Sequence, residues 1–70
     1  SPDGPMTEED ALHLVSMEQK SIEAMTKLSE LESYRTDNAF KLKRLRDAHP
    51  TIADELAAFY TQHYKEIENG

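Results

Sequence analysis

The segment KLKRLRDAHPTIADEL, residues 41–56, contains the one proline in the second half of the chain, Pro50. Proline disfavours helical geometry in the residue before it, so a helix that arrives from the N-terminal side should end at His49. Thr51 is a preferred N-cap residue type, and Asp54 follows three positions later, as in a capping box. The segment therefore predicts two helices joined by a tight turn.

The chain after this turn has the pattern of an amphipathic helix, which we expect over residues 52–68. Apolar and aromatic side chains recur at helical spacing in two adjacent stripes. Asn69 and Gly70 then provide residue types that commonly end a helix. The first stripe contains Ile52, Leu56, Phe59, His63 and Ile67, and the second contains Ala53, Ala57, Tyr60 and Tyr64.

The chain before the turn begins with a capping-box pattern at Thr7 and Asp10, and a heptad repeat of mostly apolar residues follows. Neither Gly nor Pro occurs between this cap and the turn. We therefore favour one long helix over residues 8–48. The alternative is a break near Thr36 and Asp37, which lie in a stretch of low helix propensity.

A short connection brings the two predicted helices together antiparallel, which gives an all-α helical hairpin. The second helix is too short to cover the first half of the long helix, so a broad apolar face would be left exposed there. A second copy of the chain could cover this face and form a four-helix bundle, because most soluble oligomers are twofold homodimers. The residues expected in this homodimer interface are Ala11, Leu14, Val15, Met17, Ile22 and Met25.

Composition limits the class of protein further. The 70 residues carry a formal net charge of −6 and include no cysteine, which excludes disulfides and thiolate metal sites. No apolar run approaches a membrane span and no signal peptide is visible, so we expect a cytoplasmic protein without a membrane partner. We expect one domain over residues 7–70, preceded by a disordered linker or cloning remnant over residues 1–6.

A basic run at residues 35–46 has five cations and one anion, so it is locally positive within an acidic protein. Lys41 and Arg46 flank the apolar seam, where they could form ion pairs with acids of the last helix. The run can be the solvated flank of a hairpin. It can also be a nucleic-acid contact that uses residues 41–46, although an acidic chain would repel phosphates.

The residues expected to contact a protein partner form two groups. Phe40, Lys43 and Arg44 are expected to face outward and to bind an acidic surface. Tyr60 and Tyr64 form an aromatic edge that one hairpin partner cannot fully cover, and aromatic side chains are common interface anchors.

The sequence offers little to catalysis. His13, His49 and His63 are too far apart in the pattern to form a metal site, and two helices do not easily build a cleft that excludes water. We expect no catalytic residues, cofactor or metal. The sequence predicts a non-catalytic protein–protein interaction or assembly module, such as a small adaptor, regulator, inhibitor or chaperone-like binder, that acts as a helical homodimer. The alternative is a nucleic-acid-associated regulator.

Overall fold

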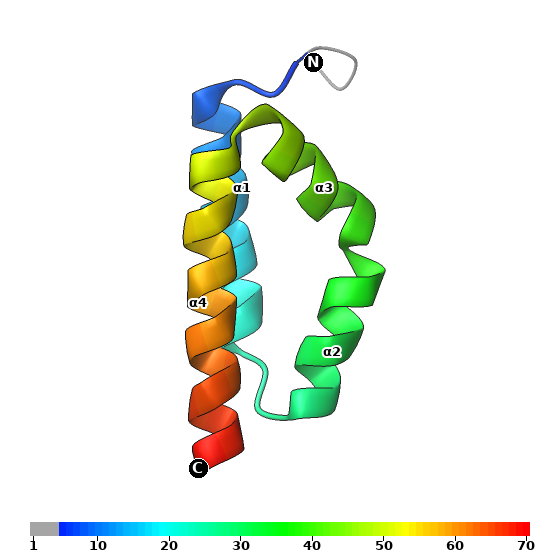
Figure 1. The fold of residues 1–70 in the computed structure, drawn as a ribbon, viewed down its shortest axis with the longest axis vertical. Coiled ribbons are helices and arrows are strands. Elements are labelled where there is room, and N and C mark those ends of the chain that lie inside the picture. Colours follow the sequence, from blue (N-terminus) through cyan, green and yellow to red (C-terminus); the bar gives the residue numbers. More distant parts are fainter. Residues whose placement is uncertain (1–4) are drawn as a thin grey trace.

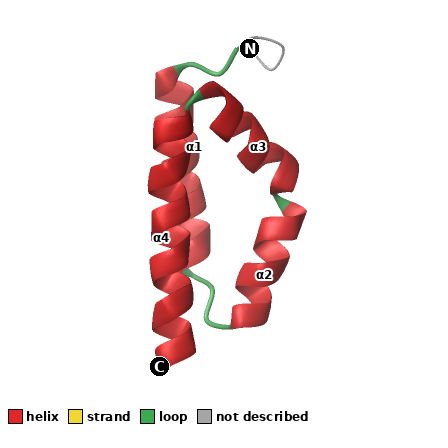
Figure 2. Ribbon diagram, viewed as in Figure 1, coloured by secondary structure: helices red, strands yellow, loops and turns green. Residues whose placement is uncertain are grey.

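In a computed structural model, residues 5–70 form four α-helices, and no strand occurs among them (Figures 1 and 2). Residues 1–4, part of the predicted N-terminal linker, lie outside the described residues. The predicted all-α class is confirmed, but the two-helix hairpin is wrong because a single chain supplies all four helices. Within residues 5–70, no helix is both long and apolar enough to cross a membrane. The helices are α1 (Glu8–Glu23), α2 (Leu28–Asp37), α3 (Ala39–Ala48) and α4 (Pro50–Asn69).

The N-terminus of α1 has the predicted capping box. The Thr7 hydroxyl accepts a hydrogen bond from the Asp10 backbone N–H at 3.1 Å, and the Asp10 carboxylate accepts one from the Thr7 backbone N–H at 3.4 Å. These contacts satisfy backbone donors that have no partner inside the helix. The hydrogen bonds with Thr7 also hold the pKa of the Asp10 carboxyl below its ordinary value.

The long helix predicted over residues 8–48 is broken twice, and the first break was not predicted. The chain leaves α1 after Glu23 and enters α2 at Leu28. The Glu30 carboxylate accepts hydrogen bonds from the backbone N–H groups of Thr26 at 3.1 Å and Lys27 at 3.0 Å, so an acidic side chain caps α2. The connection between α1 and α2 reverses the chain without Gly or Pro. It is stabilised by the burial of Ile22 and Leu31 that the reversal permits.

The second break lies at Asn38, between α2 and α3. Its backbone dihedrals, φ −110° and ψ 14°, leave the helical region, and its side-chain amide donates to the Tyr34 carbonyl at 2.9 Å. The Tyr34 carbonyl also accepts the Asn38 backbone N–H at 3.0 Å, so the break appears in the dihedral angles of Asn38. The alternative break near Thr36 and Asp37 is therefore correct to within two residues. Figure 1 shows α2 and α3 as a bent pair that bows away from α4.

The turn predicted at His49 and Pro50 is confirmed. His49 leaves the helical region with φ −142° and ψ 76°, and Pro50 is the first residue of α4. Proline suits this first position because its fixed φ is already helical and no N–H is required there. The predicted Thr51 cap is wrong, because α4 begins before that residue.

The packing of α1 on α4 overturns the reason for expecting an exposed face. The Met6 carbonyl accepts a hydrogen bond from His49 Nε2 at 2.8 Å, and the Met25 carbonyl accepts one from His63 Nε2 at 2.7 Å. These contacts join the start of α1 to the start of α4 and the end of α1 to the later part of α4. The two helices therefore run parallel and side by side, as Figure 1 shows. The buried apolar core is Ala11, Val15, Ile22, Leu31, Tyr34, Leu45, Ala53 and Leu56.

Candidate binding groove

Two adjoining hollows lie between α4 and the α2–α3 pair, and we call them together the α2–α4 groove. The inner hollow has a volume of about 320 Å³ and the outer hollow one of about 660 Å³. Both are lined by Arg35, Tyr60 and Thr61, so they meet at these residues. The inner hollow is also lined by Ile22, Tyr34, Leu42, Leu45, Arg46, Ala53, Leu56 and Ala57, and the outer one by Glu32, Thr36, Tyr64, Lys65 and Glu68.

The inner hollow reaches the apolar core. Ile22, Leu45 and Leu56 are almost completely buried, yet all three contribute to its lining. The hollow exists because α2 and α3 bend at Asn38 and bow away from α4 (Figure 1). The bend therefore leaves a depression with an apolar base between helices that would otherwise close on each other.

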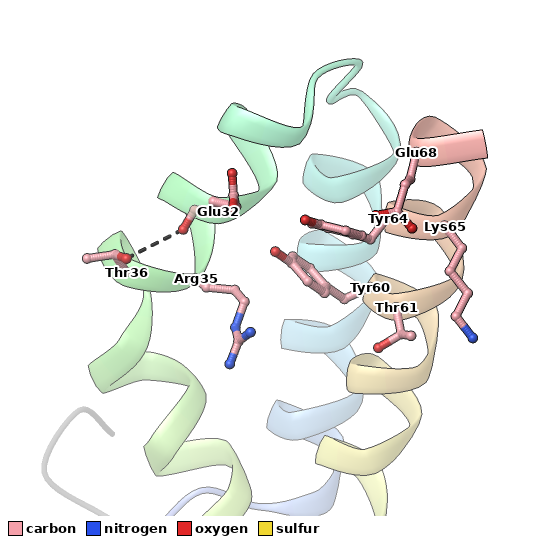
Figure 3. Close-up of a pocket in the computed structure, with 8 residues that line it drawn as sticks. All are labelled: Glu32, Arg35, Thr36, Tyr60, Thr61, Tyr64, Lys65 and Glu68. Atoms are coloured by element: carbon pink, nitrogen blue, oxygen red, sulfur yellow. Dashed lines mark hydrogen bonds between the residues drawn. The ribbon is translucent and has the colours of Figure 1, made fainter. Parts of the chain in front are cut away.

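Tyrosines from two helices form the side of the groove. The rings of Tyr34 and Tyr60 are stacked with centroids 6.1 Å apart, and Tyr64 lies 6.3 Å from Tyr60. Figure 3 shows Tyr60 and Tyr64 pointing from α4 toward α2. The Tyr60 hydroxyl donates to the Leu31 carbonyl at 2.7 Å, and burial raises the pKa of this hydroxyl despite the nearby Arg35 charge. The aromatic side is thus fixed to α2 at one point.

Arg35 lies at the junction of the two hollows. Its guanidinium carbon is 5.9 Å from the centre of the Tyr60 ring, which is within the range of a cation–π contact. The side chain is exposed, and no hydrogen bond or ion pair joins its guanidinium to another side chain within residues 5–70. Among the described residues nothing occupies its five N–H donors, which can therefore meet a ligand.

Behind the tyrosines, a buried carboxylate joins three helices. Glu18 of α1 is 5% exposed, and it accepts a hydrogen bond from the Tyr34 hydroxyl at 2.7 Å and one from Lys41 Nζ at 3.3 Å. Burial, followed by the hydrogen bond to Glu18, raises the pKa of Tyr34 well above its ordinary value. The Tyr34 side chain is therefore held neutral and in place at the side of the inner hollow.

The basic run is largely paired with acids. Arg46 contacts Asp54 at 2.8 Å, one of the pairings expected from the sequence, and Lys43 contacts Asp47 at 2.6 Å. Lys41 pairs with Glu18 of α1 and not with an acid of the last helix. These pairs reduce the positive charge that residues 41–46 present to a partner.

The predicted partner-contact residues are separated by the fold. Tyr60 and Tyr64 line the groove, whereas Phe40, Lys43 and Arg44 are exposed on α3 and are not part of its lining. Phe40 is 79% exposed, which agrees with the outward position expected for it.

The residues predicted for the homodimer interface do not form one exposed face. Ala11, Val15 and Ile22 are buried within the single chain, whereas Met17 remains 51% exposed. The other two, Leu14 and Met25, are half-buried.

Two of the three histidines make hydrogen bonds that stabilise the fold. His49 and His63 hold the chain segments at the two ends of α1, and His13 is exposed. Among the described residues, no three His, Asp or Glu side chains gather where they could hold a metal ion.

Sequence reasoning missed two residues of this region. Glu18 lies among polar residues of α1 and gives no signal of its burial, and Arg35 stands out in the sequence only as the first cation of the basic run. Only the position of α2 beside α4 brings Arg35 onto Tyr60. No protein-family model matches the chain, and neither a curated protein nor a solved structure was found to be similar.

Proposed function

We propose that the protein is a non-catalytic protein–protein interaction module whose α2–α4 groove binds a segment of another protein. The observation that supports this proposal is the inner hollow, whose base is formed by buried core residues such as Leu45 and Leu56. The exposed Ala57 and the half-buried Leu42 and Tyr60 leave part of its lining open to water. A partner segment that inserts apolar side chains would remove it from water, as in helix-in-groove recognition.

A pair of alanines on α4 gives a direct test. Ala57 lines the inner hollow, whereas its neighbour Ala58 is exposed and lines neither hollow. Peptides selected on the protein from a displayed random library should lose about tenfold or more in affinity for Ala57→Trp, because the indole would occupy the hollow. The matched variant Ala58→Trp should bind them within about twofold.

Circular dichroism should show the same helix content in both tryptophan variants, so that a loss of binding is not a loss of fold. If both variants bind the selected peptides equally well, the groove is not the binding site. If the library yields no peptide that distinguishes the parent protein from Ala57→Trp, the proposed function is wrong.

The nucleic-acid alternative rests on one observation, that Arg44 and the 79% exposed Phe40 lie on the same helix. The ion pairs of Lys41, Lys43 and Arg46 weigh against it. Retention on DNA or RNA that falls steeply with salt would support it, since neutralising phosphates releases counterions.

The homodimer also stays a prediction, and it has lost the exposed face that motivated it. Mass in solution by light scattering tests it. A monomer would leave the groove proposal unchanged, because one chain contributes every residue that lines the groove.

A further inference from the structure

The charges around the inner hollow indicate what kind of segment it would bind, given that the proposed function holds. Arg35 and Arg46 are the charged residues of its lining, and no carboxylate belongs to that lining. Because Arg46 is paired with Asp54, the rim of this apolar depression carries one positive charge without an acidic partner among residues 5–70, in a chain whose formal net charge is −6. An apolar ligand group with a negative charge beside it would fit both properties.

Arg35 is the residue best placed to bind that negative charge. Its guanidinium lies over the Tyr60 ring, and this contact restricts the Arg35 side chain. Less side-chain entropy is therefore lost when a ligand binds. The fork of N–H donors matches a carboxylate, which it can bind through two parallel hydrogen bonds. Arg46, the other cation of the lining, is already paired with Asp54 at 2.8 Å, so Arg35 is the better candidate.

The outer hollow distinguishes a peptide from a nucleic acid. Glu32 and Glu68 line it together with Lys65, so acids occupy the path by which a longer ligand would leave the inner hollow. A chain of phosphates that followed the groove would meet these acids. A peptide needs only one carboxylate beside Arg35 and can carry neutral or basic residues further along.

We infer that the ligand of the α2–α4 groove is an amphipathic segment of a protein, with an apolar side chain in the inner hollow and one neighbouring Asp or Glu carboxylate bound to Arg35. The apolar group would lie between Leu42 and Leu45 of α3 and Ala57 of α4. The acidic neighbour would then lie at the junction of the two hollows. Arg35 would select the ligand by charge, and the inner hollow would select it by shape.

Two small probes of opposite charge test this inference on the intact chain. Phenylbutyrate and phenylbutylamine share a phenyl ring and a flexible aliphatic chain and end in a carboxylate and an ammonium group. Amide shifts in a nitrogen-labelled sample, followed at millimolar probe, should change first at residues of the inner hollow such as Ala57 and Tyr60. The carboxylate should reach half-saturation at a concentration about threefold to tenfold lower than the amine.

Arg35→Gln should remove this preference and bring the two probes to the same half-saturation. Arg44→Gln is the matched control, because Arg44 is an exposed arginine of α3 outside both hollows, and the preference should persist in this variant. Thermal melts of both variants should show that each remains folded.

Each other outcome has a definite meaning. Equal binding of both probes in the groove of the parent protein would overturn the charge inference and leave the proposed function standing. An unchanged preference in Arg35→Gln would also overturn it. If neither probe shifts the amides of the inner hollow, both proposals fail. A single-stranded oligothymidylate that shifts these amides through Arg35 would overturn the inference in favour of nucleic acid.

Discussion

The side of α4 that faces α1 differs from the side that faces α2. On the first side, His63 of α4 donates a hydrogen bond to the Met25 carbonyl, and Val15 of α1 is buried. On the second side, Tyr60 of α4 and Arg35 of α2 line an open groove. The first side is closed, whereas the second leaves a hollow beside the core. Both sides come from stripes of the same helix, so hydrophobic periodicity alone does not tell a closed contact from an open one. What differs is the neighbour, because α1 runs straight along α4 whereas the α2–α3 pair bends at Asn38.

The largest difference between the two regions should come from truncating their aliphatic side chains. Ile22 of α1 is fully buried at the base of the inner hollow, whereas Leu42 of α3 is half-buried at its side. Ile22→Ala should lower the free energy of unfolding by about 2–5 kcal/mol, since a buried isoleucine loses both transfer energy and contacts. Leu42→Ala should cost clearly less. Urea unfolding followed by circular dichroism measures both, and equal losses would mean that the α3 side is as closed as the α1 side.

Tyr34 is where the two regions meet, because it bonds Glu18 of α1 and stacks on Tyr60. Tyr34→Phe should cost about 1–3 kcal/mol near pH 7, since the buried Glu18 carboxylate loses a donor. The pKa of the Tyr34 hydroxyl is higher in the folded than in the unfolded chain. The stability that the neutral hydroxyl contributes is therefore complete below the ordinary tyrosine pKa of about 10, and it is lost as the pH rises from there through the raised pKa of the folded state.

Urea titrations at about pH 8 and about pH 11 should therefore show the parent protein and Tyr34→Phe converging at the higher pH. Tyr64→Phe is the control, because its hydroxyl bonds no other residue within the described part of the chain, and its difference from the parent should not shrink in this way. Parallel loss of stability in the parent and in Tyr34→Phe would show that the Glu18 contact does not control the alkaline behaviour.

The smallest effect is expected within the groove. Tyr60→Phe removes the hydrogen bond to the Leu31 carbonyl and should cost about 1 kcal/mol, the usual net value of such a bond. Tyr64→Phe should stay within about 0.5 kcal/mol. Thermal unfolding of the two variants measures this difference. A loss in Tyr64→Phe as large as in Tyr60→Phe would mean that the hydroxyls of both tyrosines, and not that of Tyr60 alone, stabilise the fold.

The ends of the helices were predictable where a single residue type decides them. Thr7 and Asp10 indicate the start of α1, and Pro50 indicates the turn into α4. Asn38 was within the stretch suspected of breaking, but low propensity cannot decide between a continuous and a bent helix. The dihedral angles of Asn38 decide this, and they depend on how α2 and α3 pack in the folded chain.

The break after Glu23 could not be predicted from the rules that worked elsewhere. The connection has no Gly or Pro, and its one local signal is Glu30, three residues after the extended Lys27. The energy that favours the reversal is the burial of Leu31 and Ile22 against distant parts of the chain. For the same reason the sequence named Tyr60 and Tyr64 but could not place Arg35 beside them.

The parallel arrangement of α1 and α4 has a consequence for the order in which the chain folds. The contacts between them join residues 43 and 38 positions apart, whereas α3 and α4 are joined by one residue. Closing a long loop costs more conformational entropy than closing a short one, so α3 and α4 should pair before α1 docks. Refolding followed by pulsed hydrogen exchange should therefore protect the amides of α3 and α4 before those of α1.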